Sequence, residues 1–135
     1  SKEDAYSDDL ESEWRDVSIP YAEYIKKTMK IFSKRRFKKA LSRFETILDT
    51  YKDDVNGDFY AGLCLYNLGE YDDAILNFNK CKAAKFENFA EEAEWLKAMC
   101  LLNSGEKSKA TVLFNKIIDG NGYYVTQAKE KVKNN

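Results

Sequence analysis

The residues of this chain that could carry nucleophilic, redox or metal chemistry are three cysteines, Cys64, Cys81 and Cys100. The sequence contains no histidine, which is the commonest general base and the commonest metal ligand in proteins. The cysteines are odd in number, match no zinc spacing and form no Cys-x-x-Cys pair. Each lies among apolar residues at helical spacing. We therefore interpret them as small buried hydrophobic residues, with a redox or nucleophilic role as the alternative.

Adjacent carboxylates are the other candidates for chemistry, because two acids held together can act as a general acid and a general base. They occur as sequence neighbours, at Asp53-Asp54, Asp72-Asp73 and Glu91-Glu92. Neighbouring residues point apart on a helix, so these acids are better explained as helix caps and solvated faces. Gly120-Asn121-Gly122 indicates a helix break and not a phosphate-binding loop. We expect no enzyme activity, no cofactor and no metal site.

The composition is typical of one helical domain. The 135 residues are 44% hydrophobic, a third are charged, and the net charge is −1. Six Gly and one Pro exclude long loops rich in these residues. The apolar runs are too short to span a bilayer. We expect a soluble domain and leave two compartments open: the cytoplasm, or the outside of a membrane to which a longer parent protein is anchored.

Apolar residues at three- and four-residue steps predict seven helices after Pro20. Their expected ranges are 21–34, 37–51, 58–68, 71–84, 89–104, 107–119 and 123–133. Residues 53–57 read as a turn, and Gly69 is expected in the left-handed conformation that closes a helix. Gly62 lies inside an expected helix, where it predicts the close approach of a neighbouring helix.

One packing pattern recurs in the second helix of each expected pair. An Ala is followed four residues later by Phe and three residues after that by an apolar residue. The three copies are Ala40, Phe44 and Ile47; Ala74, Phe78 and Cys81; and Ala110, Phe114 and Ile117. The small residue lets two helices approach, and the Phe fills the space toward the next pair. A period of this length predicts stacked helical hairpins.

This pattern resembles the tetratricopeptide repeat (TPR) family over about residues 21–119. The central copy matches best: Gly62 stands at the first-helix Gly, Gly69, Tyr71 and Ala74 stand at the hairpin turn, and Phe78 stands at the second-helix aromatic position. The other copies are degenerate, and none has the terminal Pro of the motif. The resemblance implies an all-α, right-handed superhelical stack of about three TPR-like hairpins. Its domain would cover 21–135, with repeats at about 21–54, 55–88 and 91–121 and a capping helix at 122–133.

The first helices of such hairpins line the concave face of the superhelix, so the resemblance places a partner-binding groove there. The candidate groove residues are Phe59, Leu63, Tyr66, Asn67, Trp95, Met99, Leu102 and Asn103. Most of them are more apolar than a solvated groove requires, which suits an amphipathic helix or an extended peptide. One subgroup of the family grips acidic C-termini with basic groove residues. Ile25, Tyr60 and Glu92 are among the residues at those positions, so we do not expect that mode.

A basic run of nine Lys and Arg residues without an acid extends from Lys26 to Arg43. It predicts a patch at the first hairpin turn, formed by Lys34, Arg35, Arg36, Lys38 and Lys39. Such a patch could bind an acidic protein, a membrane surface or nucleic acid. Its alternatives are a solvated rim or pairing with the acidic residues 3–16. Nucleic acid is not an expected partner, because the net charge is −1 and aromatic residues do not interleave with the patch.

Residues 1–20 form a separate acidic segment in which Leu10, Trp14 and Val17 make a short apolar stripe. The segment is either a loose tail or an extra helix that docks Trp14 on the groove.

Two hypotheses for function follow from the sequence. The first is a non-catalytic scaffold that binds a protein or peptide partner in an apolar groove. The second is a self-associating assembly domain, a homo-oligomer, whose groove is covered by its own N-terminal segment or by a second copy.

Overall fold

The computed structural model describes residues 20–83 and 89–134, in which α-helices are joined by short connections. The helices are α2 (Tyr21–Ser33), α3 (Phe37–Thr50), α4 (Val55–Asn67), α5 (Tyr71–Ala83), α6 (Ala90–Asn103), α7 (Lys107–Gly120) and α8 (Val125–Asn134). The prediction that an N-terminal helix docks through Trp14 lies outside the described residues. None of the described helices combines the length and the apolar character that a membrane crossing requires.

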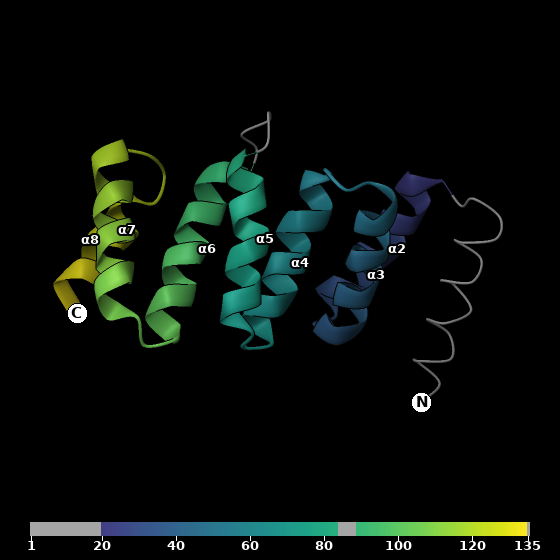
Figure 1. Ribbon diagram of the computed structural model, residues 1–135, viewed down its shortest axis with the longest axis horizontal. Coiled ribbons are helices and arrows are strands. Elements are labelled where there is room, and N and C mark those ends of the chain that lie inside the picture. The colour runs from purple at the N-terminus through teal and green to yellow at the C-terminus, as the bar shows by residue number, and fades with distance from the viewer. Residues whose placement is uncertain (1–19, 84–88, 135) are drawn as a thin grey trace.

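The helices form three hairpins, α2–α3, α4–α5 and α6–α7, and α8 follows the last of them. Each helix packs against the next one in the chain, and the hairpins follow one another along the long axis of the molecule, with α2 and α8 at opposite ends (Figure 1). The predicted helix boundaries hold to within two residues except at α4, which begins three residues earlier than expected. Asp54 is the reason, because its Oδ2 accepts a hydrogen bond from the Gly57 amide at 3.3 Å and so caps the helix.

The three hairpin turns share one backbone geometry. Gly69 and Gly105 take left-handed conformations, with φ of 79° and 89°, and Arg35 takes the same conformation in the first turn, with φ of 62°. In each turn the next amide donates to a carbonyl five residues earlier, at 3.3 Å from Arg36 to Ile31, 2.9 Å from Glu70 to Leu65 and 2.8 Å from Glu106 to Leu101. This arrangement closes a helix and satisfies one of its last carbonyls. The prediction for Gly69 is confirmed.

The recurring Ala and Phe residues make up much of the core. All three copies of each, Ala40, Ala74, Ala110, Phe44, Phe78 and Phe114, are buried. A Cβ added at Gly62 would lie 2.6 Å from Phe78 Cε1, so the close approach predicted at Gly62 is to this ring. The three cysteines are buried as well, and burial is the main cause that raises the pKa of each thiol to about 12. They therefore behave as the small hydrophobic residues that the sequence predicts.

Candidate protein-binding surfaces

The helices α4 and α6 present most of the predicted groove residues at least partly to solvent. Phe59 differs, because it is 2% exposed and its ring stacks on Phe89 at a centroid distance of 4.4 Å. Phe59 is therefore a core residue that offers no surface to a partner. The other candidates, which we call the first-helix face, are the half-buried Leu63, Tyr66, Trp95, Met99 and Leu102 and the exposed Asn67 and Asn103.

Two residues of the first-helix face meet across neighbouring repeats. The Asn103 side-chain amide donates a hydrogen bond to the Tyr66 hydroxyl at 3.0 Å, which joins the C-terminal ends of α4 and α6. The Tyr66 ring also packs edge-on against Tyr71 at 5.7 Å. Burial raises the pKa of the Tyr66 hydroxyl, and the hydrogen bond from Asn103 lowers it to a smaller extent. This end of the face is thus polar and uncharged.

Trp95 connects the first-helix face to the end of the stack. Its ring stacks on Tyr124 with a centroid distance of 5.1 Å and an interplanar angle of 6°, and it packs at 5.5 Å against Phe114. Part of this side chain therefore holds the segment that leads into α8. The sequence did not indicate Tyr124 as its partner, because helical spacing places each residue on a face without saying which ring from another part of the chain covers it.

The N-terminal end of α6 makes the other end of this face acidic. The exposed carboxylate of Glu92 interacts electrostatically with the hydroxyl groups of Tyr60 and Tyr124. Burial is the larger cause that raises the pKa of both tyrosines, and the Glu92 carboxylate raises it further. The first-helix face therefore runs from a neutral end at Tyr66 and Asn103 to an acidic end at Glu92.

The basic patch at the first turn lies at the surface, with Lys34, Arg35, Arg36 and Lys38 exposed and Lys39 half-buried. The Arg35 guanidinium lies over the Phe37 ring, 5.3 Å from its centroid. Arg43, the last residue of the basic run, is fully buried and does not belong to this surface. Its Nε donates to Thr28 Oγ1 at 2.9 Å, and its guanidinium lies 4.0 Å from the centroid of the Tyr24 ring. Arg43 thus belongs to the basic run of the sequence, but it is not one of the residues predicted to form the patch.

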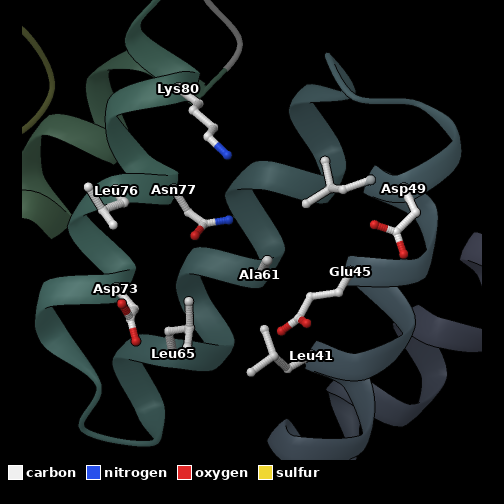
Figure 2. A pocket seen from close by; sticks show the side chains of 10 residues that line it. Leu41, Glu45, Asp49, Ala61, Leu65, Asp73, Leu76, Asn77 and Lys80 are labelled. Atoms are coloured by element: carbon white, nitrogen blue, oxygen red, sulfur yellow. The ribbon is translucent and has the colours of Figure 1, made fainter.

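A hollow of ≈ 380 Å³ is lined by residues of α3, α4 and α5 (Figure 2). Helices α3 and α5 form its two walls, and we call it the second-helix hollow. It is lined by the apolar Leu41, Leu48, Ala61, Leu65 and Leu76 and by the polar Glu45, Asp49, Asp73, Asn77 and Lys80. None of these residues was predicted to belong to a site. The available signal was the presence of leucines, such as Leu41 and Leu76, at second-helix positions that the Ala and Phe pattern does not require.

Two solved structures share the fold of this chain. One is the TPR2B domain of yeast Sti1 from a TPR2B-domain:pHsp70 complex, with a TM-score of 0.70 and 19% identity over 83% of this chain and 92% of that chain. The other is the Yersinia enterocolitica type III secretion translocator chaperone SycD, with a TM-score of 0.71 and 16% identity over 83% of this chain and 80% of that chain. No protein-family model and no curated protein matches the sequence. The likeness confirms the predicted fold, an all-α stack of TPR-like helical hairpins.

Proposed function

We propose that this chain is a non-catalytic interaction scaffold that binds a peptide, a helix or a partner domain on its first-helix face. The observation that carries the proposal is the combination of accessible apolar side chains, Leu63, Met99 and Leu102, with the polar pair Tyr66 and Asn103 at one end. An apolar helix surface that carries a few fixed hydrogen-bonding groups suits an amphipathic helix or an extended peptide. The TPR-like fold supports this function, since one structure that shares it is a complex with pHsp70 and the other is a chaperone.

The charges of the face narrow the chemistry of the partner. A ligand that ends in a carboxylate would meet the exposed Glu92 carboxylate at the acidic end. Like charges placed together across an interface disfavour binding. We therefore infer a neutral or basic ligand, whose apolar side chains fill the space between Glu92 and the Tyr66–Asn103 pair.

The test is a peptide selected on the wild-type chain from a random display library, whose Kd is then measured on two matched variants. Asn103→Arg places bulk and charge on the first-helix face, and Asn115→Arg makes the same change at an exposed residue of α7. We expect Asn103→Arg to weaken the selected peptide about tenfold or more, with an unchanged circular dichroism spectrum, and Asn115→Arg to have no effect. Equal affinity for both variants would place the binding site elsewhere.

The same pair of variants tests the alternative that the first-helix face associates with a second copy. Light scattering over a dilution series gives the mass of the particle. A monomer at micromolar concentration supports the scaffold. A dimer that Asn103→Arg disrupts and Asn115→Arg preserves would show that the face serves homo-oligomerisation instead.

A further inference from the structure

The second-helix hollow contains apolar side chains that a partner could cover. Leu76 of α5 is 60% exposed, and Leu41, Leu48 and Leu65, which also line the hollow, are half-buried. Removing apolar area from water is favourable by roughly 25 cal/mol per Å². A group of leucines that is open to water on the surface is therefore a candidate contact for another molecule.

The polar residues of the hollow are unbalanced in charge. Three carboxylates, Glu45, Asp49 and Asp73, line it together with one ammonium, that of Lys80. Glu45 and Lys80 extend from opposite walls toward the middle of the hollow (Figure 2). The Lys80 charge also acts on the buried Asp58, whose pKa it lowers against the larger effect of burial. One ammonium does not balance three carboxylates, so the residues that line the hollow carry a net negative charge.

Glu45 is exposed at the wall of the hollow, next to a second acid of the same helix. Burial raises the pKa of its carboxyl group, and repulsion from Asp49 on the same helix raises it further. A cation beside Glu45 would offset both effects, because it stabilises the ionised form. The hollow thus combines an apolar floor with acids that a cationic ligand would satisfy.

We propose that the second-helix hollow binds a basic amphipathic helix of a partner protein, with its apolar residues on Leu65 and Leu76 and its Lys or Arg side chains beside Glu45 and Asp73. A helix fits the shape, because the hollow is bounded along its length by α3 and α5, and helices pack into the groove between neighbouring helices. This surface lies on other residues than the first-helix face, so the proposal does not depend on the one above.

The charge of the hollow argues against three other occupants. The phosphates of nucleic acid and the headgroups of an anionic membrane would be repelled by its carboxylates. The chain's own residues 1–16 hold seven acids and two basic residues, so they would be repelled as well. The charge of the hollow therefore favours a positively charged partner.

The probe is a fluorescein-labelled helical peptide of about 18 residues, long enough to form a helix in contact with protein, with Leu along one face and Lys on its flanks. One control peptide carries Glu in place of Lys, and a second carries Ser in place of Leu. Fluorescence anisotropy with the full chain should show binding of the first peptide alone, and raising the salt from about 50 mM to about 300 mM should weaken it, because exposed ion pairs are screened. Absence of binding, or equal binding of either control peptide, would overturn the proposal.

Variants of the chain locate the contact. Glu45→Gln combined with Asp73→Asn, and separately Leu76→Ser, should each weaken the probe about tenfold. Matched changes at exposed residues of α7, Asp119→Asn and Val112→Ser, should preserve the wild-type affinity. An equal loss of affinity in the control variants would overturn the assignment of the probe to the second-helix hollow. A dimer in light scattering that the Glu45→Gln and Asp73→Asn changes dissociate would assign the hollow to a second copy, and would overturn a foreign helix as its occupant.

Discussion

Asp58 is a buried carboxylate on the first turn of α4, only 4% exposed. Its Oδ1 accepts no hydrogen bond from the part of the chain that the structure describes. Burial raises its pKa from 3.8 to about 6, with Lys80 opposing this shift and Asp54 and Asp53 adding to it. The folded chain therefore favours the protonated form of Asp58 more than the unfolded chain does, and stability becomes linked to pH.

The free energy of unfolding should decrease as the pH rises from about 4 to about 6.5. In this range the folded state holds a proton on Asp58 that the unfolded state, with a pKa near 3.8, has released. A shift of this size corresponds to roughly 3 kcal/mol at full titration. Asp58→Asn should be more stable than wild type at pH 7 by about 1–3 kcal/mol and should lose this pH dependence. Urea unfolding of both proteins at pH 4 and pH 7 measures the difference, and parallel pH profiles would contradict it.

Gly62→Ala should lower the free energy of unfolding by about 1–3 kcal/mol, although Ala is the better helix former. The reason is steric, because the new Cβ would lie 2.6 Å from Phe78 Cε1 and the buried ring has to move. Gly120→Ala is the matched control, since nothing lies within 4 Å of a Cβ there. Chemical denaturation of the two variants compares them directly. Equal stability would mean that the Phe78 ring adjusts without cost.

At the scale of the elements, the three hairpin turns reach one geometry with different sequences. The second and third turns use Gly69 and Gly105 at the left-handed position, and the first uses Arg35. A side chain in this conformation costs roughly 1–2 kcal/mol, whereas Gly adopts it freely. The cation–π contact of the Arg35 guanidinium with the Phe37 ring offsets part of this conformational cost. The first turn is therefore the one in which a substitution could increase the stability of the chain.

Arg35→Gly should stabilise the chain by about 0.5–1 kcal/mol, because the left-handed strain removed exceeds the exposed contact with Phe37. Gly69→Ala, which introduces the same strain in the second turn, should destabilise it by about 1 kcal/mol. Thermal unfolding followed by circular dichroism gives both changes. A lower melting temperature for Arg35→Gly would show that the contact with Phe37 outweighs the backbone strain.

At the scale of the whole molecule, the core is a row of three clusters that share helices. Tyr24, Phe44 and Cys64 belong to the first cluster, on α2, α3 and α4. The second contains Phe59, Phe78 and Cys100, on α4, α5 and α6, and the third contains Ala98, Phe114 and Ala128, on α6, α7 and α8. Each cluster thus joins consecutive helices of the stack, and stability is expected to be a sum of local terms along it.

Trp95→Ala should loosen the C-terminal end of the stack more than the N-terminal end. It removes the ring that stacks on Tyr124 and packs against Phe114, and we expect a loss of about 2–4 kcal/mol. Hydrogen exchange followed by mass spectrometry should show lower protection in α8 and α7, while α2 and α3 stay closer to wild type. A uniform loss of protection in all helices would show that the stack unfolds as a single unit.

The sequence by itself determined the helices, their order and the hairpin stack, because these features follow from local rules. The Ala and Phe pattern identified residues such as Ala74 and Phe78 as core, and Gly69 marked a helix end through its conformational freedom. The start of α4 was placed too late, because residues 53–57 were interpreted as a turn, although Asp53-Asp54 had been interpreted as a possible cap and Asp54 caps a helix that begins at Val55.

Only the tertiary structure decided which apolar side chains remain accessible. The family resemblance implied that both Phe59 and Leu63 line the groove, but the Phe89 ring covers Phe59, whereas Leu63 is half-buried. Arg43 belongs to a basic run in the sequence, yet it lies buried between α2 and α3. The second-helix hollow is formed by three helices from two hairpins. The physical reason is common to all three: exposure depends on which neighbouring element covers a residue, and local spacing does not contain that information.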